Sequence, residues 1–294
     1  MNTKDLAYFC QLVDHKNYTA TAKYFGVSQP TITMAIKRLE KEYGNVPLIT
    51  QPYPRASLVV TRAGKVLYQQ ACDILNRLQT TQTEVLHAAE DSIRLGISPV
   101  AGVTWFPKVA NQLLKTNLLS DLEVHEAGSQ QLLKDLVNGQ IDAALLATVQ
   151  PLKDPEFKTL LLAIHPFKII VSDHHPLAQR DAVSFSELRQ ERFITMTNHY
   201  IHARALEAYS RVAQFTPNVV YRTSELSMVK ALVRKNVGVS LLVETAVDQD
   251  LGIHTLALTD APPTLSYMYL VTRASFHPTK KQAFFIQLFR EKGR

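Results

Sequence analysis

The chain has 294 residues, of which 46% are hydrophobic and 20% charged, an ordinary composition for a globular protein with a full core. It contains no run of about 18 apolar residues and no secretory signal region, so we expect neither membrane insertion nor secretion, and a cytoplasmic location. Its net charge is +6, and residues 1–65 alone carry nine Lys or Arg against four Asp or Glu, a net +5. This concentration of positive charge predicts a phosphate-binding module attached to a nearly neutral body.

Residues 17–43 predict two short amphipathic helices joined by a glycine turn. We expect the first helix to begin at Thr19, whose hydroxyl can cap free backbone N–H groups, and to end at Gly26. Ser28 is the expected cap of the second helix, which has an apolar stripe at helical spacing. The stripe consists of Ile32, Ala35, Ile36 and Leu39. This pattern is typical of a helix-turn-helix, although helical hairpins of this shape also occur as plain packing units.

The opposite face of the second helix is polar and basic, which favours double-stranded DNA as the partner. Short polar side chains near a helix N-terminus can reach base edges in the major groove, and cations can hold phosphates. The expected groove residues are Ser28, Gln29, Pro30, Thr31 and Thr33. The expected phosphate-binding residues are Lys37, Arg38 and Arg62.

Several short motifs in the first ninety residues recur in one family. They are Leu6, Tyr8 and Phe9; Tyr18-Thr19 with Ala22; Val27-Ser28-Gln29-Pro30; Ile36, Arg38-Leu39-Glu40 and Gly44; and Leu58 with Thr61-Arg62-Ala63-Gly64. In this order they resemble the N-terminal domain of LysR-type transcriptional regulators, which implies a winged helix-turn-helix over residues 1–64. The chain departs from the family in the wing, residues 48–60, which is rich in proline and is expected to have its own shape. Met34 stands where relatives often carry a polar or basic group, which implies that a family DNA contact is missing.

Residues 65–88 contain neither glycine nor proline and predict a long helix. Its apolar positions are separated by 4, 3, 4, 3, 4 and 3 residues, the repeat of a coiled-coil seam. The seam consists of Leu67, Ala71, Ile74, Leu78, Thr81, Val85 and Ala88. Such a seam needs a partner helix, or alternatively packs on its own domain. In the family this linker, here 65–91, joins two chains, so the resemblance implies a homodimer, a homotetramer built from two dimers, and an interrupted palindromic DNA site.

From Ser92 onward, short apolar runs alternate with amphipathic segments, the pattern of an α/β fold. Expected strands are 93–97, 122–126, 141–147, 167–172, 193–196, 219–222, 239–243 and 265–271, and expected helices are 105–114, 130–137, 201–213, 226–235 and 280–292. Motifs such as Gly96-Ile97-Ser98-Pro99 and His175-Pro176-Leu177-Ala178 resemble the LysR effector domain, itself similar to periplasmic solute-binding proteins. This resemblance implies an effector domain over 92–294 with two subdomains, about 92–164 plus 266–294 and about 165–265, and crossings near 163–167 and 264–267.

A ligand in such a fold binds in the cleft between subdomains, at the carboxyl ends of strands, where helix N-termini favour small anions. The residues that meet this condition are Ser98, Ser129, Thr148, Thr197, His199 and Ser224. The resemblance places Ser98 and Ser129 at family effector positions. Each hydroxyl could instead be a helix cap or turn residue, and His199 a solvated side chain.

The effector class is indicated only by a local resemblance. Residues 28–38 are similar to those of regulators of malolactic and related organic-acid genes, so the expected effector is an organic acid such as malate. No Arg or Lys stands in the cleft loops to clamp a carboxylate, however, so a neutral or aromatic ligand stays open.

The chain lacks the motifs of the common enzyme classes. There is no Walker loop, G-x-S-x-G elbow, G-x-G-x-x-G, H-E-x-x-H or C-x-x-C, so we expect no catalysis and no cofactor. His165, His174 and His175 are the nearest approach to a metal cluster, and we expect no metal there. Both cysteines, Cys10 and Cys72, lie outside the effector domain, which disfavours thiol redox sensing.

We therefore interpret the chain as an effector-responsive DNA-binding transcriptional regulator, with RNA polymerase as a further candidate partner and no membrane partner. Two alternatives stay open. One is a small-molecule-binding protein of the solute-binding type without transcriptional output, and the other is a ligand-independent repressor.

Overall fold

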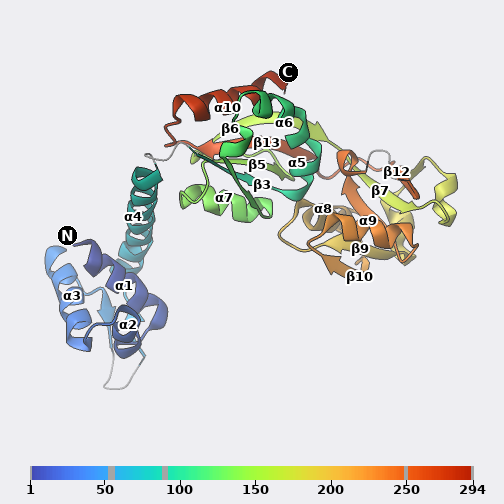
Figure 1. Ribbon diagram of the computed structural model, residues 1–294. Helices are drawn as coiled ribbons and strands as arrows, with labels where there is room; N and C mark the ends of the chain where they lie inside the picture. Colours follow the sequence, from blue (N-terminus) through green and yellow to red (C-terminus); the bar gives the residue numbers. More distant parts are fainter. Residues whose placement is uncertain (1, 52–56, 88–91, 248–250, 293–294) are drawn as a thin grey trace. The chain divides into compact units, whose positions relative to one another are not determined.

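The computed structural model describes residues 2–51, 57–87, 92–247 and 251–292, and it divides into two compact units, Met1–Leu86 and His87–Arg294 (Figure 1). The first unit contains α1 (Thr3–His15), α2 (Tyr18–Phe25), α3 (Gln29–Glu42), β1 (Ile49–Thr50), β2 (Val59–Val60) and α4 (Arg62–His87). None of the described helices combines the length and apolar character needed to cross a membrane.

The core of the first unit lies where α1, α2 and α3 meet. Leu6, Phe9 and Leu12 of α1 are fully buried in it, together with Leu48 before β1. The predicted apolar stripe of α3 is confirmed, because its four side chains are at most 3% exposed. Full burial of an aliphatic side chain contributes about 1.5–3 kcal/mol, so this stripe is what holds α3 in place.

The ends of the two hairpin helices are set by local hydrogen bonds. The predicted cap Thr19 was wrong: α2 begins at Tyr18 and Asn17 caps it, its Oδ1 accepting from the Ala20 N–H at 2.9 Å. Asn is at least as good an N-cap as Thr, and it stands earlier in the chain. Gly26 ends α2 with a φ of 65°, as expected of a left-handed C-terminal residue. Ser28 caps α3 by accepting from the Thr31 N–H, which confirms that prediction.

Helix α4 begins at Arg62, three residues earlier than predicted, and its seam divides into two parts. Leu67 and Ala71 pack into the core of the first unit, as the own-domain alternative requires. Further along, Ile74, Leu78 and Val85 are 39%, 38% and 67% exposed. Ala88 lies outside the described residues. Only the second part of the seam is therefore free to meet a partner.

The wing is a two-stranded antiparallel ribbon in which Ile49 pairs with Val60 and Thr50 with Val59. Most of the segment between these strands lies outside the described residues. The prediction that the wing has its own shape therefore stays a prediction. Thr61 joins the ribbon to α4: its N–H donates to the Leu48 carbonyl, and its hydroxyl donates to the carbonyls of Pro47 and Leu48.

The second unit contains two subdomains, the first of which is built on a five-stranded sheet with strand order β4-β3-β5-β13-β6. Strand β3 is parallel to β4 and β5, whereas β13 runs antiparallel to β5 and β6. The strands are β3 (Ile93–Ile97), β4 (Leu122–Glu126), β5 (Ala143–Thr148), β6 (Phe157–His165) and β13 (Ser266–Arg273), and the helices are α5 (Pro99–Thr104), α6 (Phe106–Lys115), α7 (Ser129–Val137) and α10 (Lys280–Lys292). Alternate residues of β5 face α7 on one side and the α6 and α10 side on the other.

The second subdomain has a four-stranded sheet of order β11-β7-β12-β8 and a parallel pair, β9 and β10. A bridge between Phe193 and Val239 links the two groups of strands. The strands are β7 (Phe167–Ser172), β8 (Ala182–Val183), β9 (Arg192–Met196), β10 (Asn218–Thr223), β11 (Ser240–Val243) and β12 (Ile253–Leu258), and the helices are α8 (Ile201–Val212) and α9 (Leu226–Arg234). Short 3-10 helices in the described part of this unit are η1 (Leu119–Asp121), η2 (Pro176–Gln179), η3 (Phe185–Gln190) and η4 (Glu244–Ala246).

The predicted two-subdomain α/β fold is confirmed, and all eight predicted strands and five predicted helices of this unit are present. Strands β6, β8 and β12 and helix α5 were missed. Strand β6 lacks clean polar and apolar alternation because it is half exposed, and α5 is a short helix that opens with proline. The chain passes between the sheets at Pro166 and again between β12 and β13.

A buried ion pair ties β3 to the turn that precedes β5. The backbone N–H, Nε and Nη2 of Arg94 all donate to the Asp142 carboxylate, with Nη2 to Oδ1 at 2.6 Å, and Nη1 donates to the Gly139 carbonyl. Both side chains are less than a tenth exposed. Arg273, also buried, donates to the carbonyls of Leu136 and Ile141. Together these arginines hold the end of α7 and the turn before β5 against the sheet.

Candidate functional site

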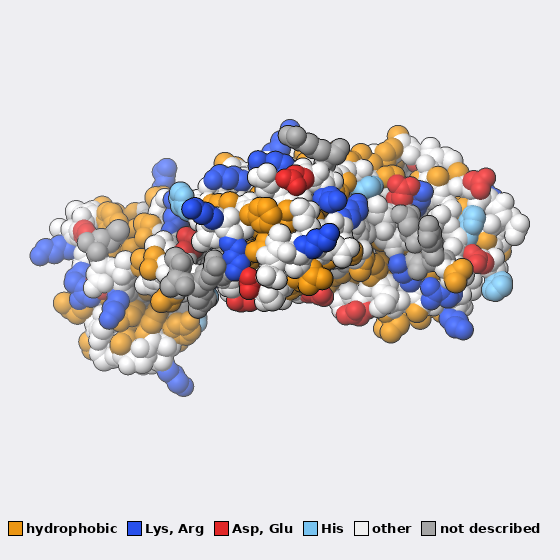
Figure 2. All heavy atoms as spheres, turned by 45° about the horizontal axis from the view of Figure 1, so that its top comes forward, with side chains coloured by type: hydrophobic (Ala, Val, Ile, Leu, Met, Phe, Trp, Pro, Cys, Tyr) orange, Lys and Arg blue, Asp and Glu red, His pale blue; other side chains and the backbone are white. Residues whose placement is uncertain are grey.

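The outward face of α3 carries the predicted DNA-contacting residues. Ser28, Gln29 and Pro30 are exposed, as are Lys37 and Arg38. Arg62 is exposed at the start of α4. Figure 2 shows Lys and Arg side chains prevailing over acidic ones on the visible surface of the first unit. An exposed helix face with polar residues at its beginning and cations along its length is the form in which helix-turn-helix proteins read the major groove.

Three of the predicted groove residues make local side-chain hydrogen bonds. The Ser28 and Thr31 hydroxyls lie 2.8 Å apart, and the Thr33 hydroxyl donates to the Gln29 carbonyl at 3.2 Å. Both threonines are half-buried. The exposed Gln29 is therefore the residue best placed to reach a base edge with both an amide donor and a carbonyl acceptor.

Arg38 has a protein partner that the sequence did not predict. Its Nη2 donates to Asp5 Oδ1 at 2.6 Å and its Nε to Oδ2 at 2.9 Å, so the guanidinium links α3 to α1. Asp5 is buried, while about half of the Arg38 side chain stays exposed. The hydrogen bond that Arg38 donates to Asp5 raises the pKa of Arg38, which keeps its charge in place. A phosphate would have to share this cation with Asp5.

An apolar hollow of about 750 Å³ lies beside the wing in the first unit. The residues that line it come from the end of α3, the following turn and the start of α4: Tyr43, Val46, Leu48, Arg62, Ala63, Val66, Leu67 and Gln70. Val46 and Val66 are both exposed. Exposed apolar residues that gather in one hollow mark a surface suited to a protein partner.

Three predicted effector residues follow strands of the first sheet. Ser98 comes directly after β3, is buried, and precedes α5 without a side-chain capping bond. Ser129, also buried, begins α7, and its Oγ accepts from the Ala147 N–H of β5 at 3.3 Å. Thr148 ends β5, and its hydroxyl donates to the Gln150 carbonyl. The structure thus gathers Ser98, Ser129 and Thr148 at the carboxyl ends of β3 and β5.

Two further residues come from the second subdomain, in the loop between β9 and α8. The Thr197 N–H donates to the Thr223 carbonyl, which fixes this loop to β10. His199 lies against Gly128: a Cβ on that glycine would be 2.7 Å from the His199 carbonyl oxygen. Gly128 is the N-cap of α7, and Tyr200 is the N-cap of α8. The N-termini of α7 and α8 therefore meet where the strand ends of the two sheets face each other. We call this region the subdomain boundary.

Ser224, predicted as an effector residue, does not have the alternative role of a helix cap. The N-cap of α9 is Glu225, and Ser224 is exposed. Strand β10 extends to Thr223, whose hydroxyl accepts from the Glu225 N–H and so moves the start of the helix one residue onward.

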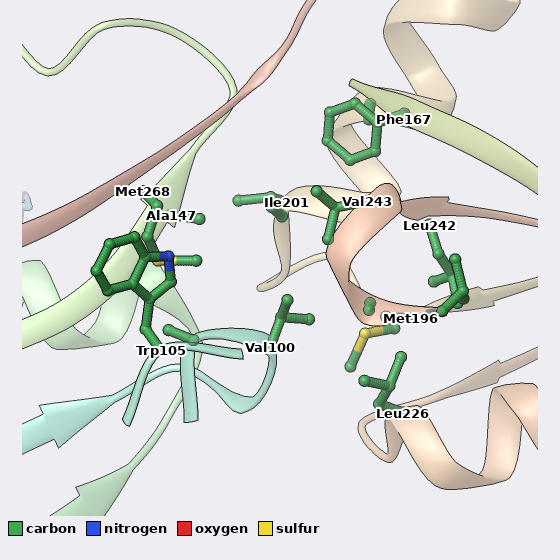
Figure 3. Close-up of a cluster of buried hydrophobic side chains, with 14 of the residues drawn as sticks. Val100, Trp105, Ala147, Phe167, Met196, Ile201, Leu226, Leu242, Val243 and Met268 are labelled. Carbon is green, nitrogen blue, oxygen red and sulfur yellow. The ribbon is translucent and has the colours of Figure 1, made fainter. Parts of the chain in front are cut away.

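Apolar side chains fill much of the subdomain boundary, and sequence reasoning missed them (Figure 3). From the first subdomain come Val100, Trp105, Ala147 and Met268; from the second come Phe167, Met196, Ile201, Leu226, Leu242 and Val243. Ala147, Met196 and Val243 are the last or next-to-last residues of their strands. The rule that ligands bind at the carboxyl ends of strands could have identified these three residues. They were missed because apolar side chains at these positions are also typical of an ordinary hydrophobic core.

Three titratable residues surround the meeting point of α7 and α8. His202 is 1% exposed, has no hydrogen-bond partner for either ring nitrogen among the described residues, and meets the Phe167 ring edge to face. Burial lowers its pKa to about 4, so it is neutral at pH 7. Burial, then Glu225 and Glu126, raise the pKa of Tyr200. Arg222 reaches the same loop, because its Nη1 donates to Asn198 Oδ1 at 3.3 Å. Sequence reasoning missed this cation because it lies in a strand.

The described residues contain no group of three or more His, Cys, Asp or Glu side chains that could hold a metal ion. The two cysteines of the chain, 62 positions apart, both lie in the first unit with their Sγ atoms 3.5 Å from each other.

Comparison with known proteins matches both units. A family model described as bacterial regulatory helix-turn-helix protein, lysR family, matches residues 3–65, and the LysR substrate binding domain matches residues 87–294. The malolactic fermentation system transcriptional activator of Lactococcus lactis is 33% identical over 85% of this chain and 84% of its own length. The hydrogen peroxide-inducible genes activator of Dickeya chrysanthemi is 28% identical over 85% and 81%.

Solved structures agree in fold. Full-length BenM aligns over 99% of this chain and 96% of its own, with a TM-score of 0.55 and 20% identity. The effector binding domain of QuiR in complex with shikimate aligns over 69% of this chain and 96% of its own, with a TM-score of 0.60 and 17% identity.

Proposed function

Because the chain belongs to the LysR family of transcriptional regulators, we propose that its α3 reads DNA in the major groove and that its subdomain boundary binds a small organic acid. Family members bind DNA and small-molecule effectors and form oligomers, and they are not enzymes. The observation that carries the DNA-reading part of the proposal is the exposed polar and basic face of α3 within a complete helix-turn-helix.

We assign two kinds of contact to the DNA interface. Ser28, Gln29, Pro30, Thr31 and Thr33, at the beginning of α3, contact the bases or the groove edge. Lys37, Arg38 and Arg62 hold phosphates, with Arg38 shared between DNA and Asp5. Base contacts set sequence preference and phosphate contacts set salt dependence, so the two groups have distinguishable effects.

Replacing Lys37 with Ala is expected to weaken binding to all DNA sequences and to lower the salt slope by about one, because one released counterion is lost. Replacing Gln29 with Ala should instead relax sequence choice and leave the slope unchanged. The measurement is the dissociation constant on specific and random duplexes across a salt series, with Lys115→Ala, an exposed lysine of α6, as the control. If Lys37→Ala changed specificity and kept the slope, the assigned roles would be exchanged.

The DNA-reading function itself is tested by footprinting the full-length protein on the intergenic DNA upstream of its own gene. A protected, interrupted palindrome with a steep salt dependence supports a dimeric reader. Weak protection without sequence preference would favour the alternative of a ligand-binding protein without transcriptional output.

The organic-acid effector rests on the converging N-termini of α7 and α8, whose free N–H groups favour an anion. We place Ser98, Ser129, Thr148, Thr197, His199 and Ser224 around it. The malolactic activator of Lactococcus lactis, a relative at 33% identity, supports the same ligand class. Glu126 and Glu225 lie close enough to Tyr200 to raise its pKa, and Arg222, which reaches the same loop, supplies a positive charge against them. The apolar wall with Trp105 and Phe167 makes a neutral or aromatic ligand the second candidate.

A dicarboxylate such as malate, at about 100 times its dissociation constant, is expected to stabilise the second unit by about 2.7 kcal/mol. Ser129→Ala and Ser98→Ala should each weaken this ligand about tenfold, because a hydrogen bond to a charged group is lost. Fluorescence of Trp105, the one tryptophan of the chain, and thermal unfolding report binding, and Ser120→Ala serves as the control because it removes an exposed hydroxyl. A response to aromatic acids alone would select the second candidate. Unchanged induction in both variants would favour a ligand-independent repressor.

For assembly, we propose a homodimer joined through the exposed part of the α4 seam at Ile74, Leu78 and Val85, and a homotetramer built from two such dimers. The hollow beside the wing adds apolar surface to the dimer contact. In this proposal residues 1–64 form the DNA-binding domain, residues 65–91 the dimerising linker and residues 92–294 the effector domain. The protein acts in the cytoplasm. An effector that prefers one arrangement of the subdomains shifts the population and alters how the DNA is held, and with it the access of RNA polymerase.

A further inference from the structure

Met34 is a large apolar side chain at the centre of the outward face of α3. It is 52% exposed, whereas the stripe on the opposite face of the helix is almost fully buried. At 3.6 residues per turn it lies one turn after Pro30 and one turn before Lys37 and Arg38. All of these neighbours are exposed as well. Met34 therefore stands inside the strip of α3 that the proposed function turns toward DNA.

The surroundings of Met34 restrict what can cover it. A protein partner would have to bury the neighbouring cations, of which Arg38 already contacts Asp5 whereas Lys37 would need paired anions. DNA supplies those anions as phosphates on both sides of the groove. Within the major groove, the apolar group that a base pair presents is the 5-methyl group of thymine. An exposed thioether one turn before two cations thus fits one chemical partner.

Resting on the proposed placement of α3 in the major groove, we propose that Met34 reads thymine through its 5-methyl group and is a specificity-determining residue of the DNA site. The unbranched methionine side chain has three rotatable bonds and adapts to an irregular apolar surface. This apolar contact takes the place of the polar or basic side chain that relatives often carry at this position. In a symmetric dimer it occurs once in each half-site.

The proposal is tested with duplexes in which single thymines of the footprinted site are replaced by deoxyuridine, a change that removes only the methyl group. Affinity of the full-length protein is measured at one salt concentration. Deoxyuridine at one position of each half-site should weaken the wild-type protein about 15-fold, which is about fourfold for each of the two methyl groups removed from an apolar contact. Met34→Ala should weaken binding to the thymine duplex by a similar factor and lose the deoxyuridine effect at that position. Met34→Leu should keep the effect, and the salt slope should stay unchanged in both variants.

The matched control is Val212→Ala, which removes an exposed apolar side chain from α8 and should leave the deoxyuridine effect intact. The proposal is overturned if no deoxyuridine position weakens the wild-type protein, or if Met34→Ala and wild type lose the same factor at every position. Failure of the proposed function looks different, because Gln29→Ala and Lys37→Ala would then also be silent. If Met34→Ala folded poorly, the wild-type series together with Met34→Leu would still decide.

Discussion

Replacing Asp142 with Ala is expected to lower the free energy of unfolding of the second unit by about 3–5 kcal/mol, a large part of the stability of a typical domain. The reason is the Arg94 guanidinium, whose side chain is 9% exposed and which donates to Asp142 through Nε and Nη2. Without the carboxylate, a positive charge stays buried with the Gly139 carbonyl as its remaining partner in this network. Urea unfolding followed by Trp105 fluorescence measures the loss.

An exposed ion pair of the same chemistry is the control. Arg180 makes a two-pronged contact with Glu187, and both side chains are 44% exposed. Arg180→Ala should therefore cost less than about 1 kcal/mol. Replacing Arg94 and Asp142 together by leucine removes both buried charges and should recover most of the stability. Equal losses for Asp142→Ala and Arg180→Ala would show that burial does not decide the strength of the Arg94 pair.

Replacing Gly64 with Ala is expected to destabilise the first unit by about 3 kcal/mol and to abolish tight operator binding. A Cβ at this position would lie 2.1 Å from the Leu48 carbonyl oxygen and 2.9 Å from Val60 Cγ1, so α4 would have to move away from the wing. Overpacking of this kind typically costs about 1–3 kcal/mol, and here the obstacle is a backbone atom. Thermal unfolding and operator affinity of the full-length chain provide the two measurements.

Gly26→Ala separates the effect of space from that of backbone conformation. Gly26 has a φ of 65° and nothing within 4 Å of the position of a Cβ, so alanine there meets only the left-handed backbone penalty of about 1 kcal/mol. A larger loss for Gly26→Ala than for Gly64→Ala would mean that α4 and the wing adjust to each other easily.

Local signals predicted the parts of the fold that depend on neighbouring residues. The buried stripe of α3, its cap Ser28, strand β7 and helix α10 all match their predictions because spacing and capping are read within one segment. The Arg38 pair with Asp5 joins residues 33 positions apart, and no local pattern announces it. Strand β6 was missed for a similar reason, since it is half exposed and is completed by its pairing with β13 from the far end of the chain.

The candidate effector site was predictable in position but not in chemistry. The rule about strand ends placed Ser98, Ser129 and Thr148 together, and the structure brings them to one edge of the sheet. The contact of Gly128 with His199 and the buried His202 depend on how the two sheets pack, which a single sequence does not encode locally. The roles of all these residues in ligand binding stay predictions.

The place of β13 between β5 and the edge strand β6 has a consequence for synthesis of the protein. Its neighbours β5 and β6 are completed about a hundred residues earlier in the chain, because the whole second subdomain is made in between. At about 5–20 residues per second, the ribosome leaves β5 and β6 without their shared partner for roughly 5–20 s. Unpaired strand edges invite association with other nascent chains. The last thirty residues therefore decide whether the first sheet closes, and a chaperone that shields strand edges during this interval should raise the yield of folded protein.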